Sequence, residues 1–525
     1  MSYHPVLLAG GWRPAQASGS FRAENPATGE LLPDEFPISA WADCETALAA
    51  ATQAAYLLRQ TPPASIARFL NGFADRIEAR KVELVEAAHA ETALPKAPRL
   101  AEVELPRTTG QLRQAAAVVL EGSWALPTID TRLNIRSLLG PIGPVLIFGP
   151  NNFPFAYNGV AGSDFASAIA AGNPVIAKAH PCHPLTSKLI AEAACAALLE
   201  SGLPLTAVQM LYHLAPEDGV RCVTDRRLSA IGFTGSRAAG LKLKAAADAV
   251  GKPIYLEMSS LNPVLILPGA LAERGAKIAE ELAASCLLAS GQFCTSPGLT
   301  VLIASHEADN FIADVKARLE GASITPLLGS GVARNLAASV GTLRQAGAEL
   351  LTGGVPLAGN RFANTLLRAS GEAFLAAPEQ LQTEAFGNAS LIVVVRDAGE
   401  AAQVLEHMEG NLTGSIYSDT RGGDDPLYAQ LAPRLRARVG RLLNDKMPTG
   451  VAVTAAMNHG GPFPATGHPG FTAVGFPAAF RRFAMLQCFD NVRPHRLPAA
   501  LQNQNPHGST WRLIDGTWSQ QNIPG

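Results

Sequence analysis

Short apolar runs alternate with helix-forming segments between residues 144 and 233, and this alternation limits the possible fold more than any other feature. The expected strands are 144–148, 174–178, 208–212 and 228–233. Residues 163–171 are expected to form a helix, and apolar residues from Leu185 to Leu198 recur at helical spacing before Gly202 ends that segment. Buried strands that alternate with amphipathic helices are typical of a parallel, doubly wound α/β sheet.

The chain has 525 residues, too many for one simple core, so we expect two or three domains. Residues 40–119 are rich in helix formers. Further strands and helices are expected at 254–256, 263–267, 271–290, 307–320 and 391–395. We therefore place a domain change near Glu257. The polar residues 500–525 are expected to be a surface extension.

The charges nearly balance, with 42 Lys and Arg against 44 Asp and Glu and a net charge of -2. This balance provides no electrostatic reason to expect nucleic acid or a membrane as partner, whereas a small-molecule substrate fits it. The N-terminus does not resemble a signal peptide, and no apolar run is long enough to span a membrane. We therefore expect a cytoplasmic protein.

The seven cysteines are scattered and contain no CxxC pair, which argues against a zinc knuckle or a disulfide framework. His180 and His183 have a spacing that could suit a metal, but no further ligand is in sight. We expect no metal site.

Two segments contain residues suited to acyl chemistry. Cys294 lies in Gly291-Gln292-Phe293-Cys294-Thr295, beyond an apolar helix. A buried structural thiol is the commoner role of a cysteine, and a nucleophile is the alternative. Glu257 follows an apolar strand, where a carboxylate is unusual. It could cap a helix or pair with Lys252, or it could be a general base that activates water.

Two loops that follow strands complete the set. The loop Gly149-Pro150-Asn151-Asn152-Phe153-Pro154 has asparagines that could be turn formers, or could donate an amide hydrogen to an oxyanion. Gly232-Phe233-Thr234-Gly235-Ser236 places glycines and a hydroxyl at a helix start, which suits a phosphate. It is not the GxGxxG fingerprint, and alone it is weak evidence.

Together and in this order, these segments resemble the aldehyde dehydrogenase superfamily, from Asn25-Pro26-Ala27-Thr28-Gly29-Glu30 through Glu384-Ala385-Phe386-Gly387. The resemblance implies that Cys294 is the nucleophile, Glu257 the general base and Asn152 an oxyanion donor. It also implies a nicotinamide dinucleotide, NADP or NAD, as cofactor. The residues expected to bind the cofactor are Pro150, Lys178, His180, Gly235, Ser236, Glu384 and Phe386.

The resemblance further implies a Rossmann-type dinucleotide-binding domain, a catalytic domain and a β-hairpin oligomerisation arm. These would comprise residues 1–122 with 142–256, residues 257–480, and residues 123–141 with 483–499, followed by the extension 500–525. The arm pairs subunits in this family, so a homodimer or homotetramer is expected.

Departures from the common family pattern indicate a branch. Met258-Ser259-Ser260-Leu261-Asn262-Pro263 replaces the usual Gly-Gly after the Leu-Glu pair, and His459-Gly460-Gly461-Pro462 is also distinctive. This set looks like the branch of 2,5-dioxovalerate (α-ketoglutarate semialdehyde) dehydrogenases. An NADP-linked fatty aldehyde dehydrogenase is the alternative. The first substrate is an anion, and Arg107, Arg441 and Lys446 are its candidate cations, although a surface charge is the commoner role of each.

Pro181 stands where NAD-preferring members often place a glutamate that would repel a 2′-phosphate, so we expect NADP to be accepted. Two other protein classes stay open. A CoA-acylating dehydrogenase generally lacks the general base, so Glu257 counts against it. A non-enzymatic binding or structural protein on this fold often loses the nucleophile, which this chain keeps.

Overall fold

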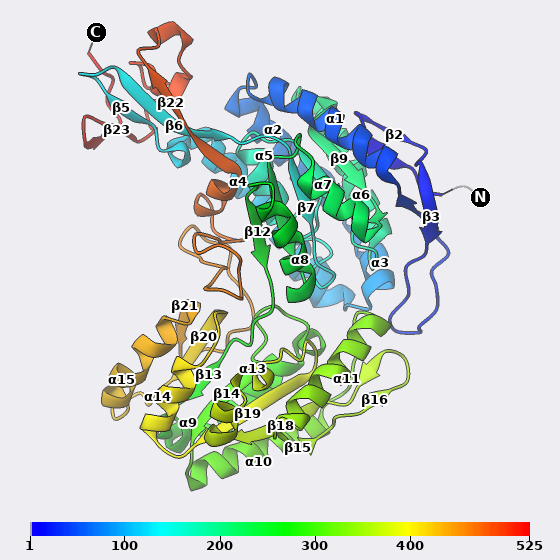
Figure 1. The fold of residues 1–525 in the computed structure, drawn as a ribbon, viewed down its shortest axis with the longest axis vertical. Helices are drawn as coiled ribbons and strands as arrows, with labels where there is room; N and C mark the ends of the chain where they lie inside the picture. Colours follow the sequence, from blue (N-terminus) through cyan, green and yellow to red (C-terminus); the bar gives the residue numbers. More distant parts are fainter. Residues whose placement is uncertain (1–2, 525) are drawn as a thin grey trace.

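The computed structural model describes residues 3–524, and Figure 1 shows two α/β domains with a separate projecting sheet. The first domain has a seven-stranded sheet in the order β12-β11-β7-β8-β9-β1-β2. Its strands are β1 (Val6–Leu8), β2 (Gly11–Arg13), β7 (Val145–Phe148), β8 (Val175–Lys178), β9 (Val208–Leu211), β11 (Ala230–Thr234) and β12 (Ile254–Glu257). The five strands from β7 to β12 in this sheet are parallel, which confirms the predicted α/β fold.

Helices cover this sheet because its central strands are apolar and buried. They are α1 (Trp41–Leu58), α2 (Pro63–Ala79), α3 (Lys81–Thr92), α4 (Leu105–Glu121), α5 (Ser163–Ala170), α6 (Pro184–Ser201), α7 (Pro216–Thr224) and α8 (Arg237–Asp248). A π-helical segment, η1 (Lys96–Glu104), leads into α4, and a small sheet joins β3 (Ala17–Phe21), β4 (Phe36–Ser39) and β10 (His213–Leu214).

The second domain follows β12 and has its own seven-stranded sheet, in the order β15-β18-β19-β14-β13-β20-β21. Its strands are β13 (Val264–Ile266), β14 (Leu299–Ile303), β15 (Glu349–Thr352), β18 (Thr365–Ser370), β19 (Ala389–Val395), β20 (Asn411–Tyr417) and β21 (Val439–Asn444). Its helices are α9 (Pro268–Leu287), α10 (His306–Gly321), α11 (Ser330–Gln345), α12 (Gly371–Ala376), α13 (Pro378–Leu381), α14 (Ala398–Glu406) and α15 (Asp425–Arg436). In Figure 1, β12 ends toward this domain, so the loops after the first sheet's strands face it.

The projecting sheet has five strands in the order β22-β6-β5-β23-β24. They are β5 (Thr128–Asp130), β6 (Ile135–Pro141), β22 (Ala484–Asp490), β23 (Arg512–Ile514) and β24 (Thr517–Ser519). Residues 500–525 were expected to be a surface extension, yet within them β23 pairs in parallel with β5, and β24 pairs with β23. The Arg512 side chain is fully buried, and its hydrogen bonds to the carbonyls of Gln502, Asn503 and Gln521 offset the cost of burying its charge.

None of the helices described over residues 3–524 is both long and apolar enough to cross a membrane.

Candidate active site

A cavity of about 390 Å³ lies where the loops of the first domain meet the second domain. Loops that follow β7, β11 and β12 provide one side, and α11 and the segment before β19 provide another. Ligands of doubly wound sheets bind at the carboxyl ends of parallel strands, and this cavity lies at that end of the first sheet. The residues around the cavity are Pro150, Asn151, Asn152, His180, Thr234, Gly235, Ser236, Glu257, Met258, Ser259, Cys294, Val332, Asn335, Leu336, Ser339, Glu384 and Phe386.

Nine of the ten residues predicted from the sequence line this cavity. The tenth, Lys178, is the last residue of β8 and lies two residues before His180, which does line it. Burial lowers the pKa of Lys178 to about 8 and that of His180 well below its usual value. The tertiary structure therefore brings together loops that are far apart in the sequence.

Cys294 lies in a loop after the short 3₁₀ turn Leu288–Gly291. Ala289, Ser290 and Gly291 all have positive φ, and a Cβ on Gly291 would collide with the carbonyl of Gly387. Only glycine fits this close approach, so the glycine three residues before the thiol is a packing requirement. The Asn262 amide donates to the carbonyl of Cys294 at 2.9 Å and so holds the loop from the other side.

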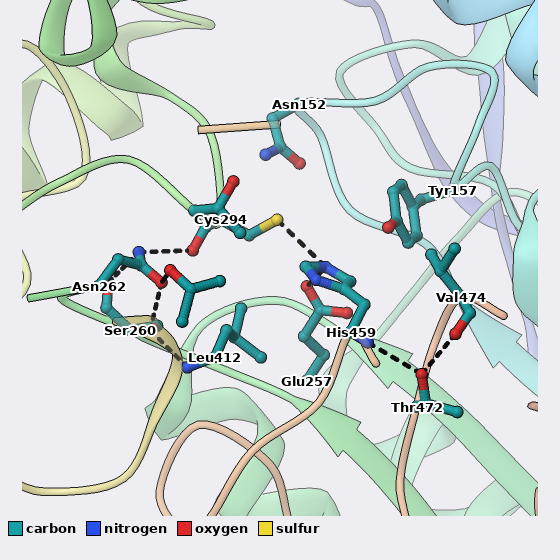
Figure 2. A network of polar contacts seen from close by, with 12 residues as sticks. Asn152, Tyr157, Glu257, Ser260, Asn262, Cys294, Leu412, His459, Thr472 and Val474 are labelled. Carbon is teal, nitrogen blue, oxygen red and sulfur yellow. Dashed lines mark hydrogen bonds and ion pairs between the residues drawn. The ribbon is translucent and has the colours of Figure 1, made fainter. Parts of the chain in front are cut away.

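His459 joins the thiol to the carboxylate, as Figure 2 shows. Its Nε2 lies 3.4 Å from Cys294 Sγ and 3.0 Å from Glu257 Oε1. His459 and Glu257 are each 1% exposed. The His459 backbone N–H donates to Thr472 Oγ1 at 2.9 Å, which holds the backbone of His459 in place. The sequence indicated that the His459-Gly460-Gly461-Pro462 segment is unusual, but it assigned His459 no role.

The surroundings of the Cys294 thiol favour its protonated form. Burial raises the pKa of Cys294 well above its usual value, and the Glu257 charge raises it further, while the Arg107 guanidinium opposes both. A protonated thiol is a weak nucleophile, so attack requires a nearby proton acceptor. In the tautomer with the ring proton on Nδ1, His459 Nε2 can accept the thiol proton, and only after that transfer can the same nitrogen donate to the Glu257 carboxylate.

Glu257 is the last residue of β12, and its backbone is fixed on two sides. Its carbonyl accepts from the N–H of Gly235 at 3.1 Å, and it forms a β-bridge with Thr466. Within the described part of the chain its Oε2 is buried without a hydrogen-bond partner. A buried carboxylate oxygen that lacks a partner is suited to accept a proton from water in this cavity.

Asn152 lies beside Cys294 (Figure 2). Its amide donates to the Gln292 carbonyl at 2.9 Å. The second amide hydrogen is free to donate into the cavity. Arg99 donates to the Asn152 carbonyl at 3.1 Å and forms a buried ion pair with Glu104. This ion pair anchors the loop that holds the amide.

Gly235 and Ser236 form a cradle suited to a phosphate. Ser236 is the N-cap of α8, and helix starts present backbone N–H groups to anions. A Cβ on Gly235 would lie 2.9 Å from the Phe233 ring, so the bare backbone is required there. Across the cavity, burial raises the pKa of Glu384 to about 7, opposed by hydrogen bonds from Ser259 and Ser260. A carboxyl group at this place can accept hydrogen bonds from ribose hydroxyls.

The ligand atoms of Glu257, Cys294 and His459 lie within 4.8 Å of one another, so these three residues are the group with spacing for a metal ion in residues 3–524. The His180 and His183 rings are stacked, but their nitrogens bond to the protein itself. His183 Nε2 lies 3.0 Å from the Pro150 carbonyl, and His180 Nδ1 accepts from the Cys182 N–H at 3.2 Å.

Two similar proteins match nearly the whole chain in sequence. Alpha-ketoglutaric semialdehyde dehydrogenase 2 of Azospirillum brasilense is 40% identical over 97% of this chain and 98% of its own length. The alpha-ketoglutaric semialdehyde dehydrogenase of Acinetobacter baylyi is 35% identical over 91% of this chain and 92% of its own.

Two solved structures share the fold. A 1-pyrroline-5-carboxylate dehydrogenase has a TM-score of 0.81 at 22% identity, over 93% of this chain and 92% of its own. PnpE, solved in complex with nicotinamide adenine dinucleotide, has a TM-score of 0.79 at 20% identity, over 94% of this chain and 100% of its own.

The sequence model of the aldehyde dehydrogenase family matches residues 12–432, which include the cysteine loop, β12 and the loop after β7. With the relatives above, this match confirms the predicted resemblance. The chain therefore belongs to the aldehyde dehydrogenase family.

Proposed function

We propose that this enzyme oxidises α-ketoglutaric semialdehyde (2,5-dioxopentanoate) to 2-oxoglutarate through a thioester on Cys294. The observation that carries the chemistry is the contact of Cys294 Sγ with His459 Nε2 at 3.4 Å, with Glu257 Oε1 3.0 Å from the same nitrogen and placed to accept from it once the proton has been transferred. The two relatives that bear this substrate in their names, at 40% and 35% identity, support the choice of aldehyde.

In the first step His459 Nε2 takes the thiol proton, and the Cys294 sulfur forms a bond to the aldehyde carbon. The carbonyl oxygen becomes an oxyanion, which the free N–H of the Asn152 amide and the backbone N–H of Cys294 would stabilise. Removing one such donor typically costs about 100- to 1000-fold in rate. The buried surroundings strengthen these interactions because they exclude water.

A bound nicotinamide dinucleotide supplies the acceptor for the hydride that leaves the substrate carbon. Gly235 and Ser236 would hold its phosphates at the start of α8, and Glu384 and Phe386 would hold its nicotinamide end. Pro150, Lys178 and His180 would lie along the rest of it. We propose that NADP is accepted as well as NAD, because Pro181 leaves no carboxylate there to repel a 2′-phosphate.

In the last step Glu257 takes a proton from water, whose oxygen bonds to the thioester carbon. The carbon–sulfur bond breaks and the acid leaves, His459 Nε2 returns to the Cys294 sulfur the proton that it took, and the proton on Glu257 passes to solvent. A water-activating carboxylate at this place favours hydrolysis over transfer to coenzyme A, so we expect no dependence on coenzyme A.

The test follows dinucleotide reduction with 2,5-dioxopentanoate and with a long-chain aliphatic aldehyde, each with NAD⁺ and NADP⁺. We expect kcat/KM for dioxopentanoate to be higher by more than ~100-fold, about 2.7 kcal/mol of discrimination. Cys294→Ala should abolish oxidation and still bind the dinucleotide. Preference for the aliphatic aldehyde would support a fatty aldehyde dehydrogenase instead, and no reduction with any pair would support a non-enzymatic protein.

A further inference from the structure

A second cavity, of about 520 Å³, lies next to the catalytic residues on the side of α4. It shares no residue with the first cavity, but it is lined by Phe153 and Phe293, which directly follow and precede Asn152 and Cys294 in the chain. The immediate chain neighbours of Asn152 and Cys294 therefore form part of the wall of the second cavity. The dinucleotide-binding loops line the first cavity, which leaves the second for the body of the aldehyde.

Most of this second cavity is apolar, but two arginines and one glutamate line it. Arg99 and Glu104 neutralise each other in a buried ion pair. Glu104 also accepts the N–H groups of Phe155 and Ala156 at 2.9 and 3.0 Å, so its oxygens are occupied. Neither of these two side chains has charge to offer a ligand.

Arg107 differs from Arg99 because no carboxylate of residues 3–524 lies within ion-pair distance of it. Its one side-chain hydrogen bond goes to the Tyr157 hydroxyl at 3.1 Å, and its Nε is buried without a partner in the described chain. The guanidinium carbon lies 5.3 Å from the Tyr157 ring centroid and 5.9 Å from that of Phe153. The aromatic rings thus hold the cation in place and leave most of its five N–H donors free.

The position of Arg107 relative to the thiol is set by a short series of contacts. Arg107 donates a hydrogen bond to the Tyr157 hydroxyl, and the Tyr157 ring centroid lies 5.9 Å from that of His459. His459 in turn contacts Cys294 (Figure 2). The Arg107 charge also acts on the Cys294 thiol. A substrate of five carbons extends roughly 5 Å from its aldehyde carbon to its far end, so the two ends need sites that are close together.

The other two cations considered for this role are placed differently. Arg441 donates to the carbonyls of Pro448 and Gly450 at 2.9 and 3.1 Å, and so supports the loop at the cavity wall. Lys446 is exposed and does not line the cavity.

We propose that Arg107 is the binding site for the distal carboxylate of the substrate, and that it selects ω-carboxylated short-chain aldehydes over uncharged ones. The planar guanidinium suits a carboxylate because it can donate two parallel hydrogen bonds. Phe153 and Phe293 enclose the carbon chain between that carboxylate and the thiol. This inference rests on the proposed function, and it names the residue that would recognise the substrate class.

The experiment compares three aldehydes of five carbons: 2,5-dioxopentanoate, 5-oxopentanoate and pentanal. The last two differ only in a carboxylate against a methyl group. In Arg107→Met we expect kcat/KM for both acids to fall by roughly 10- to 150-fold, mainly through KM, because a charge-assisted hydrogen bond is lost. The kcat/KM for pentanal should stay within about threefold of the wild-type value.

Arg113→Met is the matched control, since it removes the same charge from the same helix. Arg113 pairs with Asp75 and Glu78 away from the cavity, so all three aldehydes should keep their wild-type rates. Arg107→Lys is the second variant. It keeps the charge but loses the planar fork, and it should lose less of the preference for acids than Arg107→Met.

A further measurement uses pentanedioate as an inhibitor of pentanal oxidation. It should compete in the wild type, and its inhibition constant should rise in Arg107→Lys. If kcat/KM in Arg107→Met fell equally for the two acids and for pentanal, the proposal would be overturned, and Arg107 would only support Tyr157. An unchanged acid-to-pentanal ratio in both variants would place the carboxylate site elsewhere. A wild-type enzyme that does not prefer acids would instead overturn the proposed function itself.

Discussion

In the proposed mechanism Cys294, His459 and Glu257 have different tasks at one buried site, where His459 Nε2 contacts both of the other side chains. The raised pKa of the thiol means that little thiolate exists at neutral pH. The imidazole provides a route for the proton during attack, and the carboxylate is needed again when water attacks the thioester. Residues that share a hydrogen-bond network can therefore still limit different steps.

Two single substitutions should separate these steps. His459→Gln should slow acylation by about 100-fold or more, the usual contribution of a positioned base. Because the thiol pKa is raised, alkylation of wild-type Cys294 by iodoacetamide should quicken as pH rises above neutral, and in His459→Gln this rise should move to higher pH. Glu257→Gln should retain a burst of dinucleotide reduction and accumulate the acyl-enzyme.

Stopped-flow absorbance, mass spectrometry of the intact protein and alkylation rates provide the readouts, with Cys294→Ser as the control for labelling at other cysteines. If Glu257→Gln lost the burst of dinucleotide reduction and His459→Gln kept it at the full rate, Glu257 would be the base for acylation and His459 the base for hydrolysis.

At the scale of elements, the η1 segment and α4 support the loop that follows β7. Glu104, at their junction, accepts two backbone N–H groups of that loop and pairs with Arg99, which in turn donates to Asn152. The loop has little regular structure of its own, so this carboxylate is one of the main contacts that fix its shape, together with the contact of His183 with the Pro150 carbonyl.

Glu104→Ala should lower the free energy of unfolding by about 3–5 kcal/mol, since it leaves the Arg99 charge buried and unpaired. It should also lower kcat, because Asn152 loses its support. Urea unfolding and steady-state rates at active-site-titrated concentration measure the two effects. Glu102→Ala is the control, because Glu102 is exposed in the same segment. If the free energy of unfolding of Glu104→Ala were within about 0.5 kcal/mol of the wild-type value, as is typical of surface substitutions, the proposed role of Glu104 would be wrong.

At the scale of the whole molecule, the projecting sheet stands apart from the two domains (Figure 1). Leu486 on β22 is 67% exposed, and Trp518 on β24 is 50% exposed. Large exposed apolar side chains on strands are typical of an association surface. We propose that this sheet pairs subunits in a homodimer or homotetramer.

Deletion of residues 509–525 tests the part that the C-terminal strands have in this sheet. The truncated chain loses β23, leaves the edge of β5 unpaired and removes the buried Arg512. We expect the Tm to fall by roughly 3 °C or more, and the molar mass from light scattering to shift from that of the full chain. An unchanged Tm and mass would show that these strands are dispensable.

Regular elements with strong periodicity were predictable from the sequence. The strand expected at 174–178 is Val175–Lys178, and the helix expected at 271–290 is Pro268–Leu287. The three-residue strand β23 was not predicted, because it is too short for a pattern and contains an arginine. Its partner, β5, is distant in the sequence, so only the tertiary fold creates the pairing.

The sequence alone determined the family and the α/β architecture, and it singled out the cysteine, glutamate and asparagine as candidates, because each lies in a local motif whose residues are contiguous. Only the tertiary structure placed His459 beside Cys294 and Glu257, put Glu104 under the loop of Asn152, and left Arg107 without the ion-pair partner that Arg99 has, which is why we propose roles for His459 and Arg107. The burial of a side chain and the presence of a counter-ion beside it depend on which distant segments of the chain come into contact. A short stretch of contiguous sequence does not specify those contacts.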